Sequence, residues 1–142
     1  MAQSYTTQGI VLQKRRYIES ARIYTIYTHD FGKLDVLVRG AGKIKSKLAL
    51  HLEPLSVVDI CFIRGKRHIQ LIGSRQQYVF KNIFSDYQAL NYGCFCVEML
   101  DKLVKPDQRD PGVYALLYSV LESLNTDAMH NNSRVALFGF IL

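Results

Sequence analysis

The spacing of apolar residues changes near residue 80, which limits the chain to folds in which strands come first and helices follow. Leu34 and Val36 alternate with more polar neighbours, the period of a half-buried strand. Leu90, Cys94 and Val97 instead recur every three or four positions, the period of a helix. We therefore predict a segregated α+β protein, with a β domain over 1–80 and an incomplete helical domain over 81–142.

Five strands are expected in the first part, over 4–14, 22–28, 33–39, 55–63 and 68–74. Tight turns around Gly32 and Gly65 make hairpins of the second with the third strand and of the fourth with the fifth. Residues 40–53 form a long connection between the third and fourth strands. A five-stranded Greek-key barrel of the OB type has its long connection at this place, so we predict an OB-type barrel. An SH3-like barrel is the alternative.

Three helices are expected in the second part. Ser85 is a plausible N-cap for the first, which Pro106 ends, and Asp110 followed by Pro111 predicts the start of the second. A third is expected to begin at one of three capping residues, Asn131, Asn132 or Ser133. Because the sequence closes on apolar residues, Phe138 to Leu142, we expect this end to be frayed or to pack against something else.

The basic residues are concentrated in the first part. Residues 1–81 hold fourteen Lys or Arg against five Asp or Glu, a net +9, and residues 82–142 hold four against seven, a net −3. A basic part of this kind is typical of a surface that meets a polyanion. A solvated basic surface without a partner is the plainer interpretation.

Motifs for catalysis are missing from the sequence. It has no G-x-x-x-x-G-K-[ST], G-x-S-x-G or H-E-x-x-H pattern, and its four His are scattered. We therefore predict no enzyme, no cofactor and no metal site. The three Cys fit no disulfide framework, and no apolar stretch is long enough for a membrane span, so we expect a cytoplasmic protein without a signal peptide or membrane contact.

The placement of the cations predicts a nucleic-acid groove. In OB folds the connections between strands one and two and between strands four and five line such a groove, together with the face of strands two and three. The candidate DNA-binding residues are Lys14, Arg15, Arg16, Arg22, Lys33, Arg39, Lys43, Lys45, Lys47, Arg64, Lys66 and Arg67. Four aromatic residues nearby offer stacking surfaces for bases, although each is individually more often a packing residue: Tyr17, Tyr24, Tyr27 and Phe31.

An ordered set of short motifs runs along the first 75 residues. It comprises Gly9 to Leu12 (Gly-Ile-Val-Leu), Glu19-Ser20, Thr28, Phe31-Gly32-Lys33, Arg39-Gly40-Ala41, Lys45-Ser46-Lys47 and Leu52-Glu53-Pro54. In order and spacing the set resembles the N-terminal barrel of RecO proteins, and the helical part is similar in character. The resemblance implies a recombination mediator in DNA repair that is nucleoid-associated and binds single- and double-stranded DNA. It further implies strand annealing, partnership with RecR and with single-stranded DNA-binding protein, and loading of RecA. Some members carry a zinc site in a later region.

Two functions remain open on the sequence alone. The first is a DNA-binding mediator that holds phosphates without base readout. The second is an OB-fold adaptor that binds protein partners or RNA and has no annealing role. The sequence does not distinguish a preference for single strands from one for duplexes.

Overall fold

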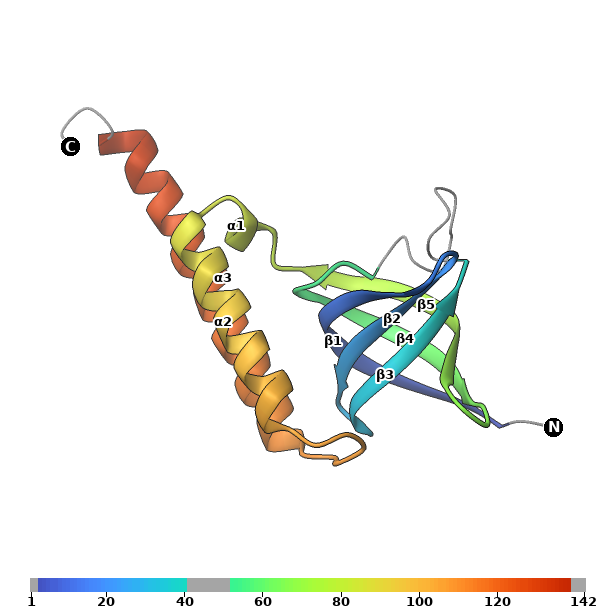
Figure 1. Cartoon of the computed structure of the whole chain (residues 1–142). Helices are drawn as coiled ribbons and strands as arrows, with labels where there is room; N and C mark the ends of the chain where they lie inside the picture. Colours follow the sequence, from blue (N-terminus) through green and yellow to red (C-terminus); the bar gives the residue numbers. More distant parts are fainter. Residues whose placement is uncertain (1–2, 41–51, 139–142) are drawn as a thin grey trace.

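The computed structural model describes the backbone of residues 3–40 and 52–138, with side chains through Ala128. Five strands come first, as predicted, and helices follow them (Figure 1). The elements are β1 (Ser4–Ile18), β2 (Ala21–Thr28), β3 (Gly32–Arg39), β4 (Ser56–Arg64), β5 (Ile69–Val79), α1 (Lys81–Phe84), α2 (Tyr87–Leu103) and α3 (Pro111–Phe138). The change from strand to helix falls between Val79 and Lys81, next to the predicted domain boundary, which itself stays a prediction.

The strands close into a barrel in the order β1-β2-β3-β5-β4, and β4 pairs back onto β1. All neighbours are antiparallel except β3 and β5, which run parallel where Val36 pairs with Ile69 and Leu37 with Gln70. The long connection falls between β3 and β4, where it was expected, since β3 ends at Arg39 and β4 begins at Ser56. The order confirms the OB-type barrel over the SH3-like alternative.

The turn between β2 and β3 shows how the sequence directs the chain locally. Gly32 has a φ of 72°, a conformation that a residue with a Cβ rarely adopts. A Cβ here would also collide with the carbonyl of Gln108 in the connection between α2 and α3. Gly32 therefore serves the hairpin and also allows this connection to lie against the barrel.

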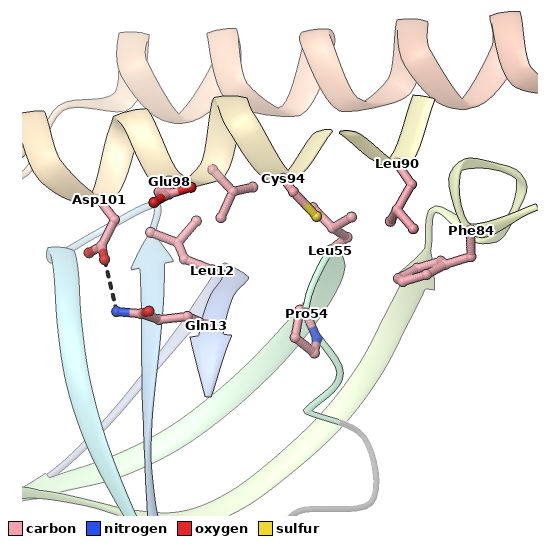
Figure 2. Close-up of a pocket in the computed structure, with 10 residues that line it drawn as sticks. Leu12, Gln13, Pro54, Leu55, Phe84, Leu90, Cys94, Glu98 and Asp101 are labelled. Atoms are coloured by element: carbon pink, nitrogen blue, oxygen red, sulfur yellow. Dashed lines mark hydrogen bonds between the residues drawn. The ribbon is translucent and has the colours of Figure 1, made fainter. Parts of the chain in front are cut away.

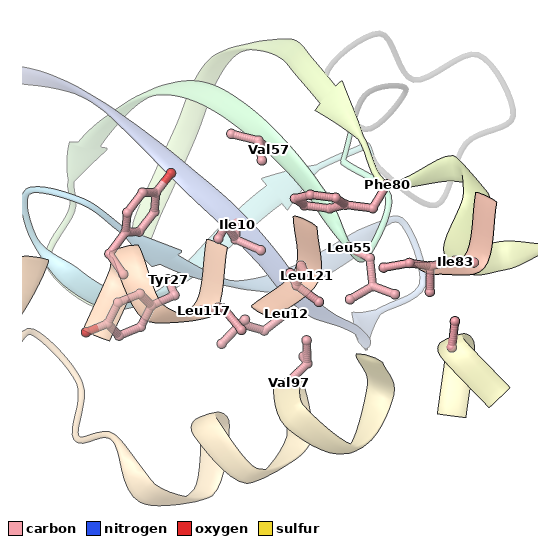
Figure 3. Packing of buried hydrophobic residues seen from close by; sticks show 13 residues of the cluster. Ile10, Leu12, Tyr27, Leu55, Val57, Phe80, Ile83, Val97, Leu117 and Leu121 are labelled. Carbon is pink, nitrogen blue, oxygen red and sulfur yellow. The ribbon is translucent and has the colours of Figure 1, made fainter. Parts of the chain in front are cut away.

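Two large hydrophobic clusters stabilise the molecule, beside a small one of Ala21, Ile23 and Leu37. One fills the barrel and includes Val36, Ile60 and Phe62. The other joins the barrel to the helices: Ile10 and Leu55 from the barrel side belong to the same cluster as residues of α1, α2 and α3 (Figure 3). Since all three helices contribute buried residues to this cluster, packing determines the position of the barrel relative to α2.

The helices correct two expectations. The N-cap of α2 is Asp86 and not Ser85. The Asp86 side chain accepts hydrogen bonds from the backbone N–H groups of Gln88 and Ala89. The predicted third helix is wrong, because α3 continues from Pro111 to Phe138 through the expected caps. No Gly or Pro follows Gly112 in this helix, and interior Asn or Ser costs less than about 1 kcal/mol each, too little to break it. The side chains of 129–142 lie outside the described ones, so the prediction for this end is untested.

Candidate nucleic-acid interface

The cations that follow the predicted end of the first strand lie on β1 and not in a connection. β1 continues to Ile18, well past the predicted end at residue 14, and the turn to β2 is only Glu19 and Ser20. Arg15 pairs with Ile23 and Arg16 with Arg22 across the two strands. Lys14, Arg15, Arg16 and Arg22 are expected from the sequence to bracket the connection between the first two strands. The structure corrects this for Lys14, Arg15 and Arg16, which lie within β1, where pairing with β2 holds their backbone in place.

A cleft of about 480 Å³ lies where β1, the start of β3 and the turn between β4 and β5 meet. Four of the predicted cations line it: Arg15, Lys33, Arg64 and Arg67. Asp35, Asp107 and His68 complete its polar lining, and the rest of the lining is Ile23, Leu34, Gly65, Ile69 and Pro106. We call this hollow the cationic cleft. It lies where an OB fold is expected to bind its ligand.

Carboxylates neutralise part of the cleft. Arg15 Nη2 is 3.7 Å from Asp35 Oδ2, and Arg64 Nη2 is 3.3 Å from Asp107 Oδ1. All four side chains keep about half of their surface exposed, so these are weak surface pairs that an incoming phosphate could replace. The acids were missed in the sequence, although the alternation along β3 places Asp35 on the outer face.

Lys33 has a different role from the arginines. Its Nζ donates to the backbone carbonyl of Asp101 at 2.7 Å and lies 3.1 Å from the carboxylate oxygen Oδ1 of the same residue. Only 13% of the Lys33 side chain is exposed. Because Asp101 belongs to α2, this cation connects the barrel to the helical part and is less available to a ligand than the arginines.

Arg64 is held between the barrel and the connection from α2 to α3. Its guanidinium carbon lies 5.9 Å from the ring centres of Tyr5, Phe31 and Phe62, within the range of a cation–π contact. Its ion-pair partner Asp107 has a φ of 61°. The rings restrict the movement of Arg64 while its charge remains half exposed at the cleft.

The remaining candidate cations are distributed around the cleft. Arg22 donates from Nη1 to the backbone carbonyls of Ile18, Glu19 and Ala21, so it supports the hairpin turn. Lys14, Arg16, Arg39 and Lys66 have exposed side chains and do not line the cleft. Lys43, Lys45 and Lys47 lie outside the described residues.

Of the four aromatic candidates, only Tyr17 is well exposed, at 46% of its surface. Tyr24 and Tyr27 belong to the core, and burial raises the pKa of both hydroxyls. Phe31 packs against Tyr5 and Phe62. Stacking on Tyr24 or Tyr27 is therefore excluded by their burial, and Tyr17 alone of the four is open to a base.

A second hollow of about 250 Å³ lies between the barrel and α2 (Figure 2). Its lining is mostly apolar and includes Leu12, Leu55 and Leu90, and Gln13 donates to Asp101 across it at 2.8 Å. It is part of the contact between barrel and helices.

In the part of the chain that the structure describes, no group of acidic, His and Cys side chains could hold a metal ion, and no helix is long and apolar enough to cross a membrane.

Comparison with known proteins identifies relatives of both parts. The family model described as "Recombination protein O N terminal" matches residues 1–77, and that described as "Recombination protein O C terminal" matches residues 84–142. The chain is 32% identical over 120 residues to "DNA repair protein RecO" of Moorella thermoacetica, covering 84% of this chain and 45% of that protein. It is 32% identical over 122 residues to the protein of that name from Listeria monocytogenes serotype 4a, covering 83% and 46%. The chain thus spans about half the length of these curated relatives.

Proposed function

This chain belongs to the RecO family, and on that premise we propose that it acts in DNA repair by binding DNA phosphates in the cationic cleft. One observation carries the proposal: three arginines line the same hollow. Arg15 belongs to β1, Arg64 ends β4, and Arg67 lies in the turn that follows β4. These residues are far apart in the sequence, and only closure of the barrel brings them together. Arginine forks suit phosphate because they offer several donors in one plane.

The cleft supports recognition of the DNA backbone and not of base sequence. Phosphate contacts orient a nucleic acid but carry no sequence information. A protein that anneals strands must accept any complementary pair, so we infer that binding is independent of sequence. We further propose, from the family membership, that the protein binds single- and double-stranded DNA, promotes annealing, and with RecR and single-stranded DNA-binding protein loads RecA.

A pair of arginine variants tests the cleft. Arg67 lines the cleft, whereas Arg75 lies on β5 beside Asp59 and outside it. Arg67→Gln should weaken binding to an oligonucleotide by about 10- to 150-fold, the range for loss of one hydrogen bond to a charged group. Arg75→Gln, which removes the same charge, should change it by less than about 2-fold, since exposed charges distant from the ligand are screened.

The measurement is fluorescence anisotropy on two single strands of unrelated sequence and on a duplex. Equal weakening of both strands by Arg67→Gln is expected. A loss on one sequence only would mean base readout, which contradicts the proposal. Equal effects of the Arg67 and Arg75 variants would place the site elsewhere, and absence of DNA binding by the unmodified protein would favour the adaptor that binds protein or RNA.

A further inference from the structure

An aromatic pair lies at the rim of the cationic cleft. His68 lines the cleft, and Tyr17, near the end of β1, lies beside it with ring centroids 5.0 Å apart and planes inclined by 73°. The Tyr17 hydroxyl and His68 Nε2 are 3.1 Å apart, within hydrogen-bonding distance. The contact therefore joins β1 to the turn before β5, the two elements that carry Arg15 and Arg67.

The pair keeps aromatic surface open to solvent. Tyr17 is 46% exposed, and the adjacent Ile18 is 51% exposed. In a nearly perpendicular pair one ring presents its edge to the other, so at least one ring retains a face that its partner does not cover. The hydrogen bond to His68 limits the orientations of the Tyr17 ring, and a tyrosine has few rotatable bonds to restrict on binding.

We propose that Tyr17 and His68 form a stacking site for an unpaired base, which makes the cationic cleft bind single strands more tightly than duplexes. The inference rests on the proposed function, because the arginines of the cleft hold the phosphates beside the stacked base. In a duplex the neighbouring base pairs cover both faces of each base. An unpaired base has a free face for the ring, and any base can use it because every base has a π-face.

Three tyrosine variants separate stacking from other roles. Tyr17→Leu removes the ring, Tyr17→Phe keeps the ring but loses the hydroxyl contact to His68, and Tyr87→Leu is the control. Tyr87 is 80% exposed at the start of α2, away from the cleft. Affinities are measured by anisotropy for a thymidine oligonucleotide, for an abasic strand with the same number of phosphates, and for a duplex.

Tyr17→Leu should weaken binding of the thymidine strand by about 5- to 150-fold, the range for loss of one base–aromatic stack. It should leave the abasic strand and the duplex within about 2-fold, because neither offers a free base face. Tyr17→Phe and Tyr87→Leu should both stay within about 2- to 3-fold on the thymidine strand. His68→Leu should repeat the pattern of Tyr17→Leu, and thermal unfolding of each variant reports whether it folds.

Two results would overturn the inference. One is an equal loss on the thymidine and abasic strands with Tyr17→Leu, which would mean that Tyr17 acts through the phosphate contacts. The other is unchanged affinity for the thymidine strand with both Tyr17→Leu and His68→Leu. The abasic strand also tests the proposed function separately. If Arg67→Gln weakens binding of the abasic strand while Tyr17→Leu leaves binding of the thymidine strand unchanged, the cleft holds phosphates but no stacked base.

Discussion

Replacing Asp35 by Asn should tighten DNA binding, because the Asp35 carboxylate occupies the space beside Arg15 that a phosphate would take. Asp35 Oδ2 lies 3.7 Å from Arg15 Nη2, and the side chains are 43% and 49% exposed. The Thr25 hydroxyl donates to the other oxygen, Oδ1, at 2.6 Å. An Asn can keep this acceptor, so Asp35→Asn removes a charge with little change in local geometry.

The size of the gain follows from the charge that is removed. A phosphate in contact with Arg15 would lie about 6 Å from Asp35, given the length of a charged hydrogen bond. Two unit charges at about 6 Å repel by about 0.7 kcal/mol in water and by about 2.8 kcal/mol at an effective dielectric constant of about 20. Because Arg15 and Asp35 are half exposed, the aqueous figure is the better guide. We expect about a 3- to 10-fold gain in affinity at low salt.

The assay is anisotropy with a single strand over a range of salt concentrations. Asp59→Asn is the matched control, because Asp59 pairs with Arg75 at 3.2 Å outside the cleft and the variant changes the net charge equally. The gain from Asp35→Asn should shrink as salt screens the remaining charges. No gain, or the same gain from Asp59→Asn, would show that Asp35 does not compete with DNA at the cleft.

In a salt titration of the unmodified protein, log K for a single strand should fall with log salt at a slope of about −2 to −3, since three or four cleft cations each release about 0.7 counterion; a flat response contradicts the phosphate site. Asp101→Ala should lower the free energy of unfolding by about 1–3 kcal/mol in urea, because Gln13 and the partly buried Lys33 lose its carboxylate; an unchanged midpoint would deny that these contacts stabilise the fold. Hydrogen bonds, first from Thr7 and then from His29, hold the pKa of Asp30 below its ordinary 3.8. The ionised Asp30 carboxylate therefore stabilises the folded protein above pH 3.8, and this contribution is lost as the pH falls through the lowered pKa of the folded state. Thr7→Val should therefore lower the free energy of unfolding in urea more at neutral pH than below pH 3.8. An equal loss of unfolding free energy at the two pH values would refute this account.

Much of the fold could be predicted because its signals are local. Alternation along β3 identified a half-buried strand, Gly32 marked the hairpin turn, and Asp110 with Pro111 marked the start of α3. Each signal needs only a few neighbouring residues, and the same residues adopt the predicted conformation in the structure. Local signals predicted the length of α3 poorly. Polar residues near 131 resemble caps in sequence, but no Gly or Pro follows Gly112 in this helix, so α3 continues to Phe138.

The candidate site depended on contacts between distant parts of the chain. The composition of the first 81 residues and the order of the strands were enough to expect a basic OB-type barrel. Which cations share a cleft was decided by closure of the barrel, which brings Arg15 to Arg64 and Arg67, and by α2, which takes Lys33 into a contact with Asp101. The physical reason is that local propensity acts over a few residues, whereas burial and ion pairing depend on whatever the closed fold places within a few ångströms.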